Sequence, residues 1–568
     1  MRQLEVALLF FTDPPRAFSA SVAALAPVVR AAGHSPIAVE VSRRSAINDV
    51  AARLHEMRPD VIGISTMTRD WPGANALLNR LEHEAYIIVG GYHASLAPRD
   101  VASCASVDAI CIGDGERPLA SLLGDLAAGD PSPPTRPGLW TRQSGTFDDP
   151  VPSADPEPDI GSLAPWDYDV FGDVQSILDE GINTFGPHSD RTLPTRAGRG
   201  CPFQCSYCSA PRWGRLQRFA DREKRNTRPV DHLCDELAAL RHRYRPEGFE
   251  FWDEHFPMSL EWLREFADKY PSRVGLPFKV EMHPNAATRD RLALLKQSGC
   301  VLFHCGIEAG DEEFRRDVLN RRTPDERLQR VFDDCRELGL ESSASLMTML
   351  PGETRAQTGK TTELLHRLRP GSFMWSTYQP LPGTVLGDDE VERWPGPARD
   401  TFRDHDPVST RTPPRISAQE RAQTFRELGA LQSQLVQLAG RRPGATPRRA
   451  RSVEVPTPMR PASEQLAAQL GLSPPGGDIS HGRANAAALV NDVLTVEIEH
   501  SAFGVHQVSI APLGTGSHFV ETAYLGLSYR GKQAPSELLR LLKRMAARLE
   551  TTQPHQLFDG LTDGHVTT

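Results

Sequence analysis

Short apolar runs alternate with amphipathic segments through the first 130 residues. Runs such as residues 4–11 (LEVALLFF) and 85–91 (AYIIVGG) are typical of buried strands, whereas residues 47–57 (INDVAARLHEM) repeat apolar side chains at helical spacing. The other predicted elements are strands at 36–41 and 60–66 and helices at 21–33, 73–82 and 117–129. Alternation of this kind predicts a parallel, doubly wound α/β sheet.

The same alternation returns between Pro194 and about residue 390. It predicts strands at 249–254, 277–283, 301–308, 342–350 and 373–381, with helices that include 228–244 and 325–339. A repeated strand–helix unit is typical of a complete or partial β/α barrel, in which the chemistry lies at the carboxyl ends of the strands. Before it, a stretch rich in Pro and Asp at 150–160 leads into 163–171 (LAPWDYDVF), which we expect to form a strap over a domain surface.

A third region begins with a predicted helix at 417–440, where Ser417 and Glu420 form a capping box and Gly440 is the stop signal. A basic linker follows at 441–452. Predicted strands at 494–500, 506–512 and 518–531 and an amphipathic helix at 536–550 then complete a small α+β domain. This domain contains no sequence motif that indicates a catalytic or binding function.

Composition narrows the class of protein. The chain has 568 residues, 39% of them hydrophobic and 24% charged, which predicts an ordinary globular protein of two to four domains. A net charge of −9 argues against binding to a nucleic-acid backbone. No apolar run approaches the roughly 18 residues of a membrane span, and the N-terminus lacks a signal peptide's basic start. We therefore expect a cytoplasmic protein without a nucleic-acid or membrane partner.

Three of the nine cysteines lie within eight residues, at Cys201, Cys205 and Cys208. Three thiolates spaced CxxxCxxC can occupy three corners of a 4Fe–4S cluster and leave the fourth iron open for reaction. The alternative is a structural zinc site, but zinc normally takes four ligands and no second cysteine pair follows. The remaining cysteines are scattered, and we expect them to be small buried side chains.

The cysteine segment (GCPFQCSYC) resembles the radical S-adenosylmethionine (SAM) superfamily, including the aromatic residue before the last cysteine. Similar motifs follow in that superfamily's order: an acidic pair in FWDEHF at 251–256, GIEA at 306–309 and PGET at 351–354. Each alone would fit a strand end or an ordinary turn, but their order is specific. The resemblance implies that these regions surround SAM, with Tyr207, Asp253 and Glu308 among the residues that bind it.

The first 130 residues resemble the cobalamin-binding domain that is fused to one radical SAM subclass. The resemblance rests on three turns at predicted strand ends: GIST at 63–66, GGYHA at 90–94 and GDGE at 113–116. Glycines there let the backbone approach a large flat ligand, and hydroxyls supply donors. The residues expected to bind cobalamin are Ser65, Thr66, Arg69, Gly90, Gly91, Tyr92, Gly113, Gly115 and Glu116. The alternative is a flavodoxin-like regulatory domain without a ligand.

The turn after the first strand departs from the usual cobalamin pattern. It reads TDPP at 12–15, with no DxHxxG and hence no histidine placed to ligate cobalt, and His93 is expected to be structural. The loop at 66–71 should face the lower side of the corrin. Arg69 cannot donate a lone pair, because its guanidinium stays protonated. Cobalt would then lack a lower ligand and give up a methyl cation more easily; alternatively, Arg69 only pairs with Asp70 or Asp100.

Residues 1–390 thus resemble the cobalamin-dependent radical SAM methyltransferases, and among these the tryptophan 2-C-methyltransferases of thiostrepton-type quinaldic acid biosynthesis. The expected fold is α/β. Its expected parts are a Rossmann-like cobalamin-binding domain at 1–140, a linker at 141–193, a partial (β/α) radical SAM barrel at 194–390, a helical connector and basic linker at 391–450, and the α+β domain at 451–568.

The resemblance implies that SAM methylates Co(I) and that methylcobalamin passes the methyl group to a substrate carbon, with an external electron donor. We expect C2 of L-tryptophan, because indole π electrons can attack a methyl cation without a carbon radical if a base removes the C2 proton. The strand-end carboxylates are Asp253, Glu254, Glu281 and Glu308. Each is a candidate for one of three roles: the base, the group that holds the substrate ammonium, or the cap on the open iron. The expected catalytic residues are Arg69, Glu281 and Glu308.

Three alternatives stay open at this stage. Glu281 could form a simple salt bridge. A radical methylase of an sp3 carbon in another natural-product intermediate would share every motif above. A cobalamin-based light or redox sensor would be a non-enzymatic protein, but a sensor needs no open iron site.

Overall fold

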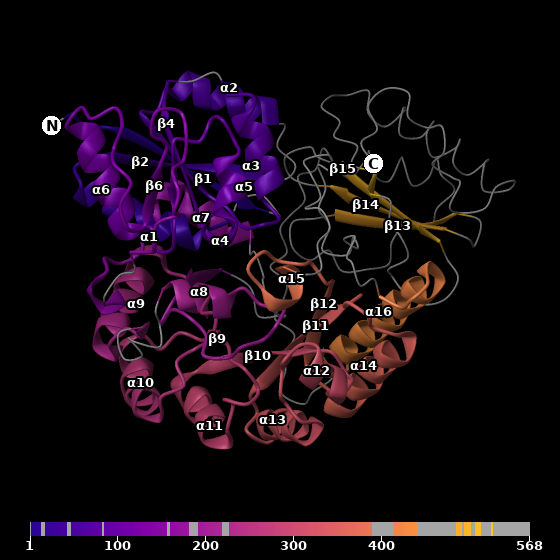
Figure 1. Cartoon of the computed structure of the whole chain (residues 1–568). Coiled ribbons are helices and arrows are strands. Elements are labelled where there is room, and N and C mark those ends of the chain that lie inside the picture. Colours follow the sequence, from indigo (N-terminus) through magenta and orange to yellow (C-terminus); the bar gives the residue numbers. More distant parts are fainter. Residues whose placement is uncertain are drawn as a thin grey trace, which may run out of the picture. The chain divides into compact units, whose positions relative to one another are not determined.

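A computed structural model shows the chain as two compact units, residues 1–416 and 417–568 (Figure 1). We describe the units separately. The residues that the structure describes are 2–12, 17–42, 47–81, 84–155, 159–180, 191–217, 226–388, 414–440, 484–490, 494–500, 506–512 and 524–525.

The first sheet of the larger unit is a doubly wound α/β sheet with the strand order β2-β1-β3-β4-β5-β6, in which only β6 is antiparallel. Its strands are β1 (Glu5–Thr12), β2 (Ser35–Ser42), β3 (Val61–Ser65), β4 (Tyr86–Gly90), β5 (Ala109–Cys111) and β6 (Leu139–Thr141). Its helices are α1 (Ala20–Ala31), α2 (Ile47–Met57), α3 (Trp71–Leu78), α4 (Tyr92–Leu96), α5 (Pro98–Ala102) and α6 (Glu116–Ala127). The predicted Rossmann-like fold is confirmed.

Side-chain alternation along β1 explains how both faces of this sheet are covered. Ala7 and Leu9 pack with residues of α2, α3, α4 and α5, whereas Val6, Leu8 and Phe10 pack with residues of α1 and α6. Because neighbouring strand residues point to opposite faces, an unbroken apolar run buries both sides of the sheet. The parallel strands therefore end at one edge, where ligands of such sheets bind.

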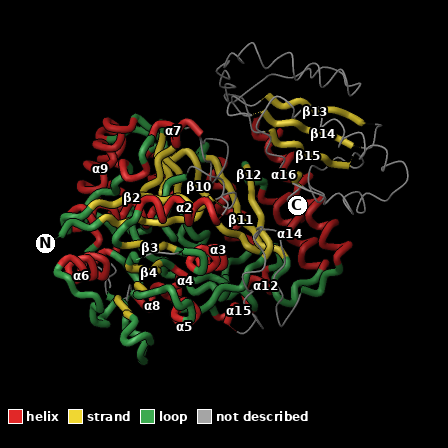
Figure 2. The backbone as a smooth tube through the Cα atoms, turned by 90° about the horizontal axis from the view of Figure 1, so that it is seen from above, coloured by secondary structure: helices red, strands yellow, loops and turns green. Residues whose placement is uncertain are grey.

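The second sheet of the larger unit is a six-stranded, all-parallel partial barrel with the order β12-β11-β10-β9-β8-β7 (Figure 2). Its strands are β7 (Thr192–Thr195), β8 (Gly248–Phe251), β9 (Phe278–Glu281), β10 (Cys300–Glu308), β11 (Glu341–Thr348) and β12 (Ser372–Thr377). Its helices are α8 (Ala210–Leu216), α9 (Val230–Tyr244), α10 (Leu260–Arg273), α11 (Arg289–Ser298), α12 (Glu312–Asp317), α13 (Asp325–Glu337), α14 (Arg355–Leu368) and α15 (Val385–Asp388). The five predicted strands all lie in this sheet.

The two faces of the barrel strands differ in chemistry. Phe251 of β8 and Phe278 of β9 contact Phe266 of α10 ring to ring. The alternating positions are charged, and Lys279 Nζ lies 3.8 Å from Glu250 Oε2 inside the sheet, where both side chains are buried. The period of two thus places apolar side chains against the helices and charged ones on the inner face.

The predicted strap is present between the two sheets. It contains the short helices η1 (Ile160–Ser162), η2 (Asp169–Phe171) and α7 (Val174–Glu180). The Asp167 amide donates to Ala23 O of α1, and the fully buried Tyr168 donates its hydroxyl to Pro194 O of β7. The strap therefore fastens the first sheet's helices to the first barrel strand.

The smaller unit contains α16 (Ala418–Gly440) and the antiparallel strands β13 (Ala484–Val490), β14 (Leu494–His500), β15 (His506–Pro512) and β16 (Tyr524–Leu525). The capping box is confirmed, because the Glu420 amide donates to Ser417 Oγ at 3.2 Å and the Ser417 amide donates to Glu420 Oε2 at 2.8 Å. The predicted helix at 536–550, and all but β16 of the predicted strand at 518–531, lie outside the described residues.

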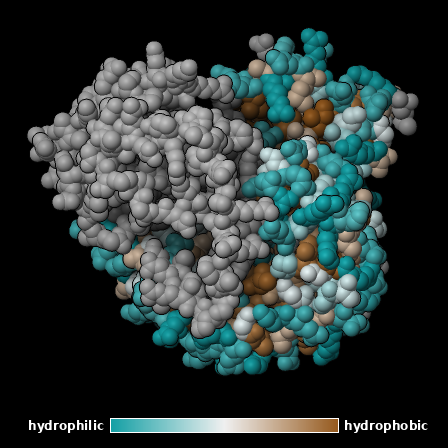
Figure 3. All heavy atoms as spheres, turned by 180° about the vertical axis from the view of Figure 1, so that it is seen from behind, coloured by the Kyte–Doolittle hydropathy of each residue, from teal (hydrophilic) through white to brown (hydrophobic). Residues whose placement is uncertain are grey.

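Where Figure 3 colours the surface by hydropathy, that surface is mostly polar, with apolar side chains in separate patches. No helix in the described ranges is long and apolar enough to cross a membrane.

Candidate functional site

The three clustered cysteines lie on the loop between β7 and α8, at the carboxyl end of the first barrel strand. Cys205 is buried, Cys201 and Cys208 are partly buried, and none forms a disulfide. Burial, together with the charge of the neighbouring cysteines, raises the pKa of Cys201 to about 11 and that of Cys208 to about 12. The Cys201 and Cys208 thiols are therefore costly to ionise without a cation, which fits a bound iron–sulfur cluster.

The spacing of these thiols argues against a mononuclear zinc site. In the part of the chain that the structure describes, no three His, Cys, Asp or Glu side chains are placed to hold one metal ion. A cubane cluster needs no such convergence, because each thiolate binds a different iron. The donor set and its loop therefore fit a 4Fe–4S cluster better than zinc.

The acidic pair after β8 holds the chain that leads into the cysteine loop. Asp253 accepts hydrogen bonds from the amides of Ala197 at 3.0 Å and Gly198 at 2.5 Å. Glu254 accepts one from the Gly200 amide at 3.1 Å. Burial raises the pKa of Asp253 to about 7, although these amides act in the opposite direction. The pair positions the segment just before Cys201, and the assignment of Asp253 to SAM stays a prediction.

Glu308 at the end of β10 lies beside Tyr207 of the cysteine loop. The Tyr207 hydroxyl hydrogen-bonds to the Glu308 carboxylate, and the Arg321 charge is close to both. Glu308 has a left-handed φ of 73° where the β10 register shifts. A non-glycine residue in this conformation is strained by roughly 1–2 kcal/mol, and such strain concentrates at functional sites.

Glu281, at the end of β9, differs from the other strand-end acids. Among the described residues, no side chain forms an ion pair with its carboxylate and none donates a hydrogen bond to it, so the salt bridge considered for this residue has no partner there. Burial, followed by the negative charge of Glu308, raises the pKa of Glu281 to about 7. Of the four acids, Glu281 is therefore the one whose carboxylate is not already hydrogen-bonded by another described residue.

Two neutral histidines also lie at the strand ends. Phe203 of the cysteine loop stacks on His283 at 3.6 Å between ring centroids and lies 5.4 Å from His255. Burial lowers the pKa of His255 to about 4 and that of His283 to about 2. At neutral pH both imidazoles are therefore uncharged and pack as aromatic rings.

The turns predicted to bind cobalamin meet at the carboxyl edge of the first sheet. Gly91 has a φ of 94°, and a Cβ there would lie 2.5 Å from Thr66 O, so only glycine fits. Ser65 Oγ lies 2.8 Å from Ser21 Oγ, and Gly90 O accepts the Thr66 amide at 3.0 Å. This close approach packs the turn after β4 against the buried Thr66 at the edge of the sheet where ligands of such folds bind.

The loop after Thr66 is exposed. Met67 is 50% exposed, and the Arg69 side chain is 45% exposed with its Nε 3.7 Å from Asp70 Oδ1. Asp100 instead faces His93 Nε2 at 3.1 Å, while His93 Nδ1 lies 3.3 Å from Thr68 Oγ1. With both ring nitrogens engaged and the ring buried, His93 is structural, as predicted. Of the two predicted acidic partners of Arg69, only Asp70 lies beside it.

Three residues predicted to bind cobalamin lie where the first sheet meets the barrel. The Tyr92 hydroxyl donates to Glu254 at 2.9 Å, and its ring stacks on Trp213 of α8 at 4.5 Å. Glu116 pairs with Arg199, which also lies 3.0 Å from Asp114. A Cβ on Gly113 would lie 2.6 Å from Gln217. The cobalamin assignment of Tyr92, Gly113, Gly115 and Glu116 stays a prediction, whereas Glu116 and Tyr92 contact Arg199 and Trp213, which flank the cysteines.

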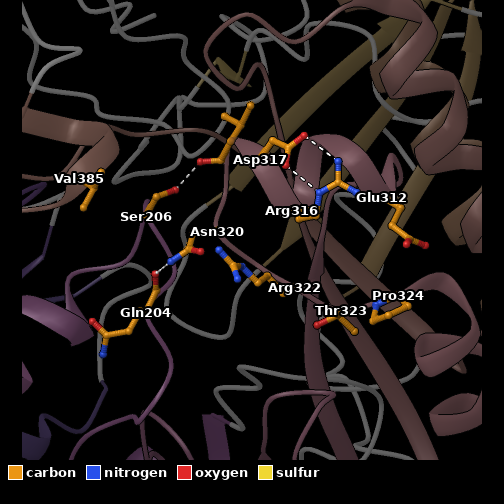
Figure 4. Close-up of a pocket in the computed structure, with 11 residues that line it drawn as sticks. Gln204, Ser206, Glu312, Arg316, Asp317, Asn320, Arg322, Thr323, Pro324 and Val385 are labelled. Atoms are coloured by element: carbon orange, nitrogen blue, oxygen red, sulfur yellow. Dashed lines mark hydrogen bonds and ion pairs between the residues drawn. The ribbon is translucent and has the colours of Figure 1, made fainter.

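A hollow of about 680 Å³ lies on the outer side of the cysteine loop (Figure 4). Gln204 and Ser206, which flank Cys205, form part of its wall. The opposite wall comes from α12 and the segment at 318–324 that follows it. The hollow therefore gives solvent an approach to the loop from outside the barrel.

Several residues of the site were not predicted. Arg321 contacts the cysteine loop, Arg199 pairs with two acids of the first sheet, and Trp213 stacks on Tyr92. Arg199 stands two residues before Cys201, a proximity that could have marked it as a candidate. Arg321 lies 113 residues after Cys208 in the arginine-rich NRRTPDE segment, where no pattern distinguishes it from Arg322.

Comparisons with known proteins agree with this architecture. Residues 14–123 match the B12 binding domain family, and residues 195–365 match the Radical SAM superfamily. The chain is 22% identical over 383 residues to the uncharacterized methyltransferase PH0819 of Pyrococcus horikoshii, covering 66% of this chain and 78% of that protein. It is 26% identical to the anaerobic magnesium-protoporphyrin IX monomethyl ester cyclase of Cereibacter sphaeroides, covering 60% of this chain and 55% of that enzyme.

Among solved structures, the fold resembles the radical SAM methyltransferase TsrM of Kitasatospora setae with cobalamin and a [4Fe-4S] cluster bound. The TM-score is 0.53 at 17% identity, over 68% of this chain and 77% of TsrM. OxsB, a cobalamin-dependent SAM radical enzyme, is also similar, with a TM-score of 0.51 at 14% identity over 64% of this chain and 52% of OxsB.

The order of the two domains, the cysteine loop at the first barrel strand and the glycine turns over the first sheet all agree with these matches. The cofactors are a 4Fe–4S cluster, cobalamin and SAM. The chain therefore carries a B12 binding domain followed by a Radical SAM domain, and this pair of domains together with the methyltransferase relative supports a cobalamin-dependent radical SAM methyltransferase.

Proposed function

We propose that this enzyme methylates C2 of L-tryptophan by polar methyl transfer. When bound, cobalamin supplies a methyl group carried on cobalt, SAM replenishes that methyl group, and the cluster supplies electrons from an external donor. Indole C2 is nucleophilic, so the protein has to align it with the methyl group and remove a proton. The likeness to TsrM, which has also been solved with tryptophan substrate and the SAM analogue aza-SAM, supports this substrate class.

The observation that carries the proposal is the state of Glu281. The neighbouring acids are already engaged, Asp253 and Glu254 by loop amides and Glu308 by Tyr207. Glu281 keeps its acceptor oxygens for a ligand, and its pKa of about 7 suits a base at neutral pH. In this assignment Glu281 takes the C2 proton, and Glu308 holds the substrate ammonium.

Arg69 and the turns of the first sheet would bind cobalamin on the side of the substrate opposite the strand-end acids. Arg69 would offer cobalt no lone pair, which would favour transfer of the methyl group as a cation. The cofactor would be held at the sheet edge by the residues predicted to bind cobalamin. These are Gly90, Gly91, Gly113 and Gly115, the hydroxyls of Ser65 and Thr66, and the side chains of Tyr92 and Glu116. The Cys201, Cys205 and Cys208 thiolates would hold the cluster, with Tyr207 and Asp253 beside SAM.

The test is product counting by mass spectrometry after incubation with SAM, L-tryptophan and a reductant. We expect 2-methyltryptophan with much less than one 5′-deoxyadenosine per product. One 5′-deoxyadenosine per methylated product would instead indicate a radical methylase, the activity expected for an sp3 carbon. Absence of methylated tryptophan would reject the substrate.

Glu281→Gln tests the base. We expect the methylation rate to fall by about 10²-fold or more, because the amide cannot accept the proton. The parent rate should rise as the pH increases through about 7, since the base must be ionised, and the variant should lose this rise. Unchanged rates in Glu281→Gln, with full iron and cobalamin content, would assign the base elsewhere.

A further inference from the structure

Arg321 lies in the segment that follows α12 and reaches the cysteine loop from below. Its Nη1 donates to Cys205 Sγ at 3.4 Å and to the Tyr207 hydroxyl at 3.2 Å, and its Nη2 donates to Gly306 O. The residue is only 5% exposed. One guanidinium therefore joins a cysteine, the adjacent aromatic residue and the end of β10.

Backbone contacts fix this segment to the loop. The Ser206 amide donates to Leu319 O at 3.0 Å, and the Ser206 hydroxyl donates to Val318 O at 2.6 Å. The Asn320 side chain donates to Gln204 O at 2.7 Å, and Figure 4 shows this contact. The two residues that flank Cys205 are thus held by the residues just before Arg321, which leaves the guanidinium little freedom to move away.

The charge of Arg321 needs a negative partner, and none of the carboxylates that the structure describes is in direct contact with it. Among the described residues no carboxylate forms an ion pair with Arg321, and its Nε has no hydrogen-bond partner. Glu308 is the carboxylate whose negative charge acts on Arg321, but it is itself hydrogen-bonded to Tyr207. An unpaired buried cation is costly, and an anionic thiolate at Cys205 removes much of that cost.

We propose that Arg321 raises the reduction potential of the iron–sulfur cluster through its charge and its hydrogen bond to the Cys205 sulfur. The reduced cluster carries one more negative charge than the oxidised one, so a fixed cation beside a ligand sulfur stabilises the reduced state more. Hydrogen bonds to cluster sulfurs and nearby charge are two of the factors that set such potentials. This role is independent of the methyl acceptor and goes beyond the proposed substrate.

The experiment compares Arg321→Gln with Arg321→Lys and with Arg322→Gln as the matched control. Glutamine keeps a donor but removes the charge, whereas lysine keeps the charge but loses the planar fork. Arg322 is the next residue, exposed on the wall of the hollow, so its charge is screened by solvent. The full-length holoenzymes are titrated with a chemical reductant, and the cluster signal is followed by electron paramagnetic resonance, after iron and sulfide content have been measured.

We expect Arg321→Gln to make reduction at least about tenfold less favourable, which equals about 59 mV for one electron. Arg321→Lys should give a smaller change, and Arg322→Gln should match the parent. An Arg321→Gln midpoint equal to that of Arg322→Gln at full iron content would overturn the proposal. Loss of the cluster from Arg321→Gln but not from Arg322→Gln would also overturn it, because Arg321 would then be a structural residue of the loop.

Discussion

At the residue scale, the site is defined by which polar atoms are already engaged. The four strand-end acids look equivalent in sequence, because all follow short apolar runs. The structure separates them: backbone amides occupy Asp253 and Glu254, Tyr207 occupies Glu308, and Glu281 keeps its acceptors. Motif order could predict the cysteines, but it could not rank the acids, since the ranking depends on amides from the distant segment at 197–200.

Arg69 yields a prediction for cobalt. Because both ring nitrogens of His93 are engaged and Arg69 cannot donate a lone pair, we expect no nitrogen ligand below the corrin. The electron paramagnetic resonance spectrum of the Co(II) protein should show no nitrogen superhyperfine splitting. Arg69→His should introduce a three-line splitting, and Arg69→Lys should not. A three-line splitting in the parent protein would contradict this account of Arg69.

The cysteine loop yields a second prediction. Replacement of Cys201, Cys205 and Cys208 by alanine should remove the iron and the brown absorbance and leave cobalamin bound, because the corrin site lies on the first sheet. Cys234→Ala, in α9, is the control and should keep its iron, since that fully buried thiol lies outside the cysteine loop. Full iron content in the triple variant would place the cluster elsewhere.

At the element scale, the strands and helices of residues 1–388 could largely be predicted, because burial on a two-sided sheet leaves an unbroken apolar run. The predicted ends of elements were less accurate: α3 begins at Trp71 and ends at Leu78, whereas the prediction was a helix at 73–82. Contacts between elements were not predictable. Tyr92 and Glu116 follow glycine turns typical of ligand sites, yet they meet Glu254 and Arg199 from the other sheet.

The turn after β4 gives a prediction at this scale. Gly91→Ala places a Cβ against the Thr66 backbone at a positive φ, so it should destabilise the domain by at least about 1–2 kcal/mol and lower cobalamin content. Gly124→Ala, inside α6 with open space around it, should be neutral or stabilising by up to about 1 kcal/mol. Thermal unfolding and cobalamin absorbance measure both. Equal effects of the two substitutions would refute the steric argument.

At the scale of the larger unit, the first sheet contacts both flanks of the cysteine loop. Arg199 precedes Cys201 and pairs with Asp114 and Glu116, and Trp213 follows Cys208 and stacks on Tyr92. The position of the cluster loop therefore depends on the cobalamin-binding domain. This coupling suits a reaction in which two cofactors must face one substrate.

Removal of Arg199 tests this coupling. Arg199→Met leaves two buried carboxylates without their cation and should cost about 3–5 kcal/mol in the free energy of unfolding. Arg117→Met breaks the exposed pair with Asp155 and should cost less than about 1 kcal/mol. Urea unfolding compares them, and equal costs would mean that the buried pair does not hold the interface.

The ion pair between Glu116 and Arg199 also makes the stability of the folded protein depend on pH. Burial alone would raise the pKa of Glu116, but the Arg199 charge and hydrogen bond outweigh it and lower the pKa below 4.5. A lowered folded pKa adds stability above the unfolded value, and that stability is lost as the pH falls through the folded pKa. The parent should therefore lose stability in acid below about pH 4.5, and Arg199→Met should lose less over the same range. If the parent and Arg199→Met lost the same stability in acid, the pair of Glu116 and Arg199 would not be the source of that loss.

The central claim, that a cobalt-borne methyl group reaches C2 of tryptophan, has a direct test. The holoenzyme is loaded with ¹³C-methylcobalamin and given L-tryptophan and unlabelled SAM for a single turnover, and the product is examined by mass spectrometry and nuclear magnetic resonance. The account predicts that the first 2-methyltryptophan formed carries the ¹³C methyl group at C2. A first product that carries only the unlabelled methyl group of SAM would contradict it.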